Sequence, residues 1–226
     1  MVEGRSEYYT VKEVRAHNKP DDLWVSFLGH VYDLTPVVSK HKEDGLVHPL
    51  IKAAGTDISH WFDEGTGEIK TYIDPTKNLK TFYVPQGRFL HVPPDEPDSD
   101  WNTDLGTPWW KDETLKVGKL SSSTRHVRVK NVLTGHEHVM EIPSEETIRQ
   151  IRARYLVFNG HAASYTWKAL KPNDEDVLAF QDLVMDLTLH DNGIVDDQPE
   201  FEVLGIDSDF HTPVIHLYYD DDLTVA

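Results

Sequence analysis

The chain of 226 residues contains no cysteine, which excludes disulfides, thiolate metal sites, iron–sulfur clusters and cysteine nucleophiles. It also lacks any apolar run that approaches the roughly 20 residues needed to span a bilayer. Residues 1–7 are without the apolar stretch of a secretory signal. We therefore expect a soluble protein of the cytoplasm that does not bind membranes.

Basic residues are scarce, because 22 Lys and Arg stand against 39 Asp and Glu, for a formal charge of −17. This balance argues against a protein that binds nucleic acid over a broad surface. Residues 172–226 contain no Lys or Arg, but they contain 15 acidic residues. Two interpretations stay open: the acidic residues between Asp174 and Asp222 form a solvated face, or they dock on a basic partner.

The motifs of common hydrolases and transferases are absent as well. The sequence has no Gly-x-Ser-x-Gly elbow, no phosphate-binding loop and no His-Glu-x-x-His helix. The acidic residues near the C-terminus lack the alternating ligand spacing and the central Gly of an EF-hand. We therefore expect no enzymatic activity.

Hydrophobic residues make up 38% of the chain and aromatic residues 10%, which suffices for folded cores. The length allows two domains of about 100 residues each. A Pro-rich stretch interrupts the periodic pattern, and it predicts a connector over residues 93–124. Trp101, Trp109 and Trp110 either hold this connector against its flanking domains or make it a partner-binding segment.

The C-terminal region begins with two alternating stretches, 126–132 and 138–142, which predict strands joined by a turn at Thr134-Gly135. Ser144 is the expected N-cap of a helix that follows the second strand. Residues 213–219 predict a last strand.

This order of elements resembles the ubiquitin-like β-grasp fold, and residues 129–135 with 141–148 are similar to the opening of ubiquitin. The resemblance implies a β-grasp domain over residues 125–226. Because the chain ends without a Gly-Gly tail, we interpret the domain as a binding module and not as a modifier. The aromatic segment 156–171 is either additional core or a partner site.

Residues 7–92 carry a second, more specific pattern. A predicted strand and tight turn lead into the sequence Val-Tyr-Asp-Leu-Thr at 31–35. Ala54-Gly55-Thr56-Asp57 and Phe62 then form a second motif. These motifs resemble the cytochrome b5 family, in a degenerate form. The fold class that the two resemblances imply is α+β, with a b5-like domain before the β-grasp domain.

In the cytochrome b5 family, two histidines bind haem iron from opposite faces. The resemblance places the first ligand at His41, although the Pro and the first Gly of the family turn are missing here. The position of the second ligand holds Gly67. Tyr72 is our candidate for a substitute ligand, because a phenolate binds ferric haem. Three further histidines rank lower as ligands, namely His48, His60 and His91. Any haem site is therefore expected to be weak or dependent on redox state.

Over nearly its whole length the chain resembles a b5-like family of motile cilia, on blocks such as 87–94, 161–167 and 211–224. The resemblance implies a radial-spoke stalk component that contacts other axonemal proteins and is needed for coordinated beating. We hold a second hypothesis beside it, a soluble cytochrome b5-type haem protein that transfers electrons. The retained His41 favours this second hypothesis.

Overall fold

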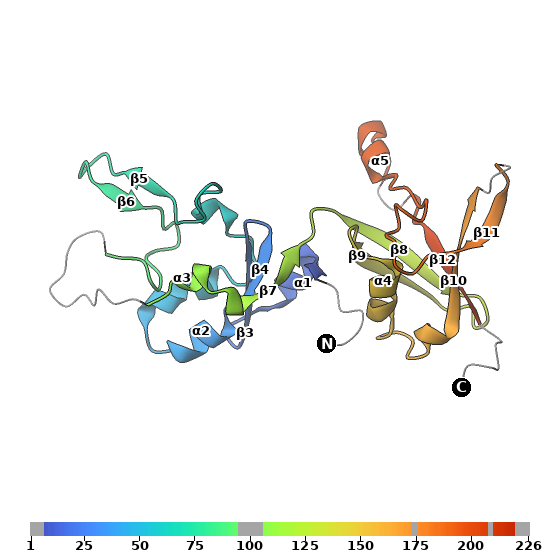
Figure 1. Ribbon diagram of the computed structural model, residues 1–226. Helices are drawn as coiled ribbons and strands as arrows, with labels where there is room; N and C mark the ends of the chain where they lie inside the picture. Colours follow the sequence, from blue (N-terminus) through green and yellow to red (C-terminus); the bar gives the residue numbers. More distant parts are fainter. Residues whose placement is uncertain (1–6, 95–105, 173–175, 208–209, 220–226) are drawn as a thin grey trace. The chain divides into compact units, whose positions relative to one another are not determined.

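The protein divides into two compact units, formed by Tyr9–Leu120 and by Ser121–Ala226 with Met1–Tyr8. In the colours of Figure 1, the first unit runs from blue to green and the second from yellow-green to red. Each unit has its own hydrophobic core. The computed structural model describes residues 7–94, 106–172, 176–207 and 210–219.

The main sheet of the first unit has the strand order β1-β7-β4-β3-β2. Its central hairpin joins antiparallel β3 and β4 through Leu28 and Gly29, whose φ angles are 49° and 76°. Positive φ at both central residues is what a two-residue turn of type I′ requires, and Gly adopts it without a steric penalty. The strands are β1 (Tyr8–Tyr9), β2 (Asn18–Lys19), β3 (Asp22–Phe27), β4 (His30–Asp33) and β7 (Lys116–Leu120).

Short helices lie between the strands of this unit, and a capping box of Thr10 with Glu13 starts the first of them. A separate hairpin of two strands, β5 and β6, follows the last of these helices. The elements are α1 (Val11–Ala16), α2 (Thr35–Lys40), η1 (Gly45–Val47), α3 (His48–Lys52), η2 (Ser59–Trp61), β5 (Thr71–Ile73) and β6 (Lys80–Phe82).

The expected connector 93–124 is corrected by the structure, because residues 106–120 belong to the first unit. The helical turns η3 (Trp109–Lys111) and η4 (Glu113–Leu115) lead into β7, which pairs with β4. Trp109 and Trp110 are 1% and 8% exposed and are part of the core of this unit. Burial of these large apolar side chains outweighs the local Pro and Gly signal. Trp101 lies outside the described residues.

The sheet of the second unit has the order β11-β10-β12-β8-β9. β12 runs parallel to β8, and the other neighbouring strands are antiparallel. Alternate residues of its central strands are buried, such as Val127, Val129, Ile215 and Leu217. The strands are β8 (Thr124–Asn131), β9 (Glu137–Pro143), β10 (Tyr165–Pro172), β11 (Leu178–Asp182) and β12 (Val214–Tyr219).

Helix α4 (Ile148–Tyr155) begins three residues later than the Ser144 cap predicted. Its N-cap is Thr147, which forms a capping box with Gln150 and so satisfies two backbone N–H groups at once. Thr147 is thus the N-cap in place of Ser144, because Gln150 stands at the position that completes its capping box. The other helical elements are η5 (Ala162–Ser164) and α5 (Gln198–Leu204).

The aromatic segment 156–171 divides between core and surface. Trp167 on β10 is 2% exposed and donates its indole N–H to the Ala162 carbonyl at 3.2 Å, so it belongs to the core. Phe158 is 51% exposed. In the described parts of the chain, no helix combines the length and the apolar character needed to cross a membrane.

Candidate functional site

His41 lies at the C-terminal end of α2, where its backbone N–H donates to the carbonyls of Val37 and Val38. At its other end, helix α2 begins at Thr35. Pro36 stands in the first turn and favours this start, because its fixed φ suits a helix. The side chain of His41 is partly buried. The expected ligand His41 therefore lies at the C-terminal end of a helix.

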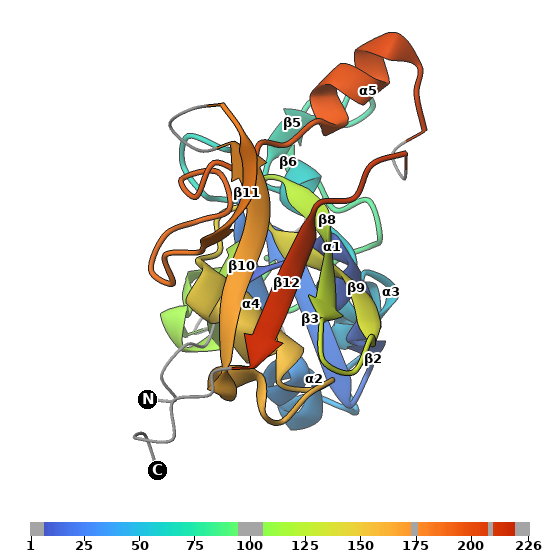
Figure 2. The same ribbon diagram turned by 90° about the vertical axis from the view of Figure 1, so that its right-hand side faces the viewer.

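The structure does not bring Tyr72 near His41. Tyr72 lies on β5 and is 46% exposed. Figures 1 and 2 both show the β5–β6 hairpin and α2 at opposite ends of the first unit. Gly67, at the family position of the second ligand, closes a loop by donating its N–H to the Asp63 carbonyl. It has no side chain that can bind iron.

Two of the lower-ranking histidines are exposed. His48 starts α3, and its Nδ1 lies 3.0 Å from the Gly45 carbonyl. This contact matches the capping role that its position before Pro49 suggests. His60 lies in η2 beside Trp61. Neither side chain is enclosed by apolar residues as a haem ligand requires.

His91 is partly buried, and a backbone contact determines its tautomer. The N–H of Trp109 donates to its Nδ1 at 3.1 Å, so the proton of the neutral ring sits on Nε2. Burial lowers the pKa of His91, with smaller contributions from the charges of His41 and Lys40. A protonated Nε2 has no lone pair for iron. His91 is thus built to donate a hydrogen bond and not to bind a metal.

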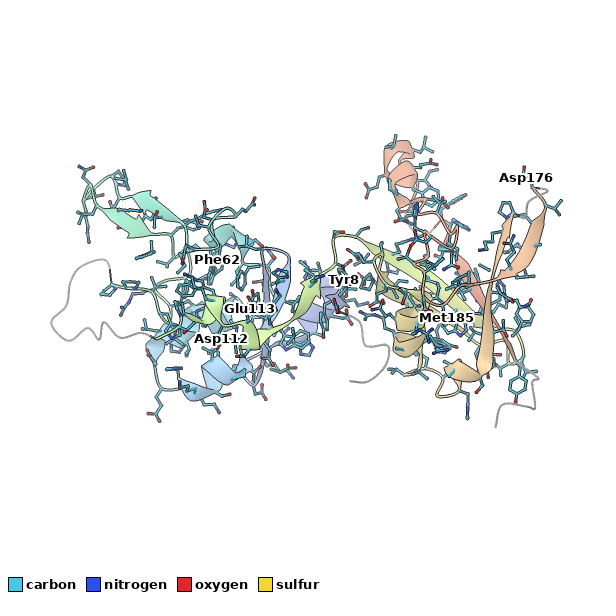
Figure 3. The ribbon with its side chains drawn as sticks, viewed as in Figure 1. Tyr8, Phe62, Asp112, Glu113, Asp176 and Met185 are labelled. Atoms are coloured by element: carbon cyan, nitrogen blue, oxygen red, sulfur yellow. The ribbon has the colours of Figure 1, made fainter. Side chains whose placement is uncertain are left out.

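The apolar space beside Phe62 is filled by the protein's own aromatic side chains. The Trp109 ring packs edge-on against Phe27 and Phe62, with ring centroids 5.8 and 6.1 Å away. Phe89 lies 5.9 Å from Trp109 and Trp110 lies 5.5 Å from it. Figure 3 shows Phe62 in the interior of the first unit. The result is a closed aromatic cluster in the core.

These residues do not fit a haem held from two sides. His41 stands where the resemblance expects the first ligand, but Gly67 has no side-chain donor and Tyr72 lies on the β5–β6 hairpin. Within the described ranges, no group of three or more His, Asp or Glu side chains is arranged to hold a metal ion. The chemistry that the described residues support is single-sided ligation by His41 at most.

Residues 195–207 and 210, around helix α5, lie inside the acidic stretch 174–222 that the sequence indicates as a possible docking face, but their exposed apolar side chains were not predicted. These side chains point away from the core: Val203 is 86%, Leu204 68% and Phe210 75% exposed. The available signal was the interleaving of acidic and apolar residues between Pro199 and Gly205. Figures 1 and 2 show α5 standing away from the sheet of its unit.

This α5 segment (residues 195–207 and 210) is held at its base by defined contacts. Buried Arg125 donates to the carbonyls of Ile194 and Val195, at 2.9 and 2.6 Å. Nδ1 of His211 lies 3.1 Å from a carboxylate oxygen of Asp197. The rings of Phe201 and Phe210 pack at 5.9 Å. An organised base with an exposed apolar tip is an arrangement that presents side chains to a partner.

The family profile described as Cytochrome b5-like Heme/Steroid binding domain matches residues 10–88. Cytochrome b5 domain-containing protein 1 of Xenopus tropicalis is 52% identical over 220 residues, 97% of this chain and 97% of the relative. The Homo sapiens protein of that name is 48% identical over 217 residues, 96% of this chain and 91% of the relative. The solved structure of Ectothiorhodospira vacuolata cytochrome b558, described as a prokaryotic homologue of cytochrome b5, is 29% identical with a TM-score of 0.23. The match covers 31% of this chain and 86% of the cytochrome b558 chain. The chain therefore belongs to the family of cytochrome b5 domain-containing protein 1.

Proposed function

We propose that the protein is a non-enzymatic structural component of the motile-cilium axoneme, located in the radial-spoke stalk and needed for coordinated beating. The ciliary setting rests on the resemblance of the sequence to a b5-like family of motile cilia. The observation that carries the docking role is the α5 segment, whose apolar side chains are exposed on an organised base.

The charge of the α5 segment indicates what kind of partner it fits. The segment contains several acidic residues, and the whole sequence after Lys171 contains no Lys or Arg. A complementary surface is an apolar groove with a basic rim on another axonemal protein. Exposed ion pairs contribute only about 0 to 1 kcal/mol each, whereas buried anchor side chains commonly cost about 2 kcal/mol or more when truncated. We therefore assign the affinity to Val203 and Leu204 and the steering to the acidic residues.

We further propose that the second unit is a ubiquitin-like β-grasp module. Its strand order supports this, because the first and last strands, β8 and β12, lie side by side and parallel in the centre of the sheet. The β8–β9 hairpin and α4 precede the remaining strands, as the resemblance implies. A module of this kind serves binding, in agreement with the docking role.

The docking role is tested with Val203→Ser/Leu204→Ser, expressed in ciliated cells that lack the native protein. We expect this double variant to fold normally and to be lost from salt-washed axonemes. The matched control is Leu133→Ser/Val157→Ser, which changes side chains that are 73% and 86% exposed elsewhere on the same unit. Incorporation of the α5 variant at the wild-type level would refute the assignment.

A soluble haem protein for electron transfer is the second candidate, favoured by His41 at the end of α2. It is tested by titrating the purified protein with haemin, oxidised and then reduced, and recording the Soret band. A band that saturates at one equivalent and disappears in His41→Ala would support this candidate. An absorption spectrum equal to that of free haemin in both states would eliminate it.

A further inference from the structure

The two edges of the sheet in the second unit differ in how they are protected. The sheet ends in β9 on one side and in β11 on the other, and Figure 1 shows β11 as its outermost strand. Proteins protect edge strands with charged residues or proline, because the unpaired main-chain groups of an edge can pair with another chain. β9 carries Glu137 and Glu141 and ends in Pro143, whereas β11 has no proline and one charge, Asp182, at its last position.

The hydrogen bonds between β10 and β11 determine which main-chain groups of β11 face outward. The Leu183 N–H donates to the Trp167 carbonyl at 2.8 Å, in the register of the two strands. Hydrogen-bonded and non-hydrogen-bonded pairs alternate in an antiparallel ladder, so Gln181 faces β10 as well, whereas Leu178 and Phe180 face the free edge. Among the described residues, the N–H groups of Leu178 and Phe180 have no hydrogen-bond partner.

The same two residues present apolar side chains on the outer face of the sheet. Leu178 and Phe180 are 63% and 46% exposed. The Phe180 ring packs edge-on against His216 and Tyr218 of β12, with ring centroids 4.8 and 5.7 Å away, so its position is fixed by contacts within the unit. Unpaired main-chain groups and alternate apolar side chains are the two features that an added strand uses.

The charge around β11 favours a basic partner over a second copy of the chain. Asp176 precedes the strand and is exposed at the tip of its hairpin, as Figure 3 shows. Asp182 ends the strand, and its side chain is 67% exposed although its carboxylate lies 2.9 Å from the Lys168 ammonium. Residues 172–226 contain no Lys or Arg, so the β11 strand of a second copy offers these aspartates no positive charge.

We infer that β11 is a docking site for an extended segment of another protein, which joins the sheet as a further strand. Residues 176, 178, 180 and 182 alternate along the chain as acidic, apolar, apolar and acidic. The complementary segment has two apolar residues at alternate positions and a basic residue on either side of them. Its main-chain hydrogen bonds supply affinity, and its side chains supply specificity. The site is distinct from the α5 segment, whose exposed side chains lie on and beside a helix.

The first test measures binding of a fluorescein-labelled peptide, Lys-Thr-Val-Thr-Val-Thr-Lys, to the purified full-length protein by fluorescence anisotropy. Phe180→Pro removes an outward N–H without removing a hydrogen bond to β10, and it should weaken binding about tenfold. Phe180→Ala keeps that N–H and should weaken binding about threefold, through the lost side-chain contact. Equal affinity of the wild type and Phe180→Pro would overturn the inference.

The matched control is Val139→Pro on the opposite edge. Because the Asn131 N–H donates to the His136 carbonyl, the same alternation turns the Val139 N–H away from β8. This variant should bind the peptide like the wild type. Val203→Ser/Leu204→Ser should also bind it normally, which separates this site from the α5 segment. Circular dichroism establishes that each variant is folded.

The second test keeps the wild-type protein and changes the peptide main chain. N-methylation at alternate residues blocks either the N–H groups that face β11 or those that face solvent. We expect one methylated peptide to lose binding and the other to keep it. Equal loss in both would show that the peptide does not bind as a strand, and it would refute the inference. A dimer of the free protein that Phe180→Pro dissociates would also refute it, because the occupant would then be a second copy.

Discussion

Two segments of this protein, residues 106–120 and the α5 segment, share several residue types but differ in the burial of their apolar side chains. Both combine a proline, glycine, acidic residues and large apolar side chains. In the first, Trp109 and Trp110 are buried in a core, whereas in the second Val203 and Leu204 are exposed to solvent. Local composition therefore does not decide whether an irregular segment is structural or is available to a partner.

The difference follows from what each segment finds beside it. Residues 116–120 form β7, which continues the sheet by pairing with β4, and this pairing carries Trp109 to an incomplete aromatic core around Phe62. Near the α5 segment, the core of the second unit is already closed by α4 and the sheet. Arg125 binds two backbone carbonyls and the Asp196 carboxylate at the base of the segment, and none of its apolar side chains. Beyond that point Phe201 packs only against Phe210 among the described aromatic rings, and Val203 and Leu204 stay exposed.

Among the variants that test this difference, replacement of Trp109 by alanine is expected to change the free energy of unfolding most. A fully buried tryptophan that contacts four aromatic rings leaves a large cavity, which costs about 3–5 kcal/mol of unfolding free energy. Urea unfolding followed by far-UV circular dichroism measures the loss. A change below about 1 kcal/mol would mean that residues 106–120 are a detachable connector after all.

Arg125→Lys is expected to loosen the base of the α5 segment. The side chain is 4% exposed, and lysine cannot reproduce the two guanidinium hydrogen bonds to the carbonyls of Ile194 and Val195. We expect a loss of about 2 kcal/mol together with faster amide exchange in α5. The control Arg128→Lys changes a side chain that is 43% exposed. Unchanged exchange in α5 would show that the segment is organised without Arg125.

Glu68→Gln tests how the Trp110 region is held, and its effect depends on pH. Hydrogen bonds from Lys111 and then from Trp110 lower the pKa of Glu68, although the side chain is 48% exposed. Because the folded-state pKa is depressed, the stabilisation is present above the unfolded pKa of about 4.3 and is lost as the pH falls through the folded pKa. We expect a difference of at most about 1 kcal/mol at pH 7, which vanishes in acid. A difference that is the same at pH 7 and pH 3 would contradict this.

Leu204→Ser is expected to have the smallest effect. The residue is 68% exposed, so its truncation should change the free energy of unfolding by less than about 0.5 kcal/mol. Urea midpoints of the variant and the wild type give the comparison. A loss above about 1 kcal/mol would place Leu204 in a packed environment and remove the basis of the docking role.

Much of the local structure could be predicted from the sequence. The turns at Gly29 and Thr134-Gly135 and the strands around them occur where the alternation of residues predicts them. The start of α4 could not be assigned, because Ser144 and Thr147 are both good caps and only the Gln150 partner separates them. Strands β10 and β11 were missed, since the aromatic residues of this region follow no clean period of two.

By itself the sequence determined the family, the two-part organisation and the places where the hairpins at Gly29 and Thr134-Gly135 turn. These properties depend on neighbours within a few residues, or on motifs whose spacing the chain retains. Only the tertiary structure decided that His41 and Tyr72 are apart, that Trp109 completes a core and that α5 is exposed. Each of these depends on contacts between residues far apart in the chain, because burial is a property of the assembled core and not of any single segment.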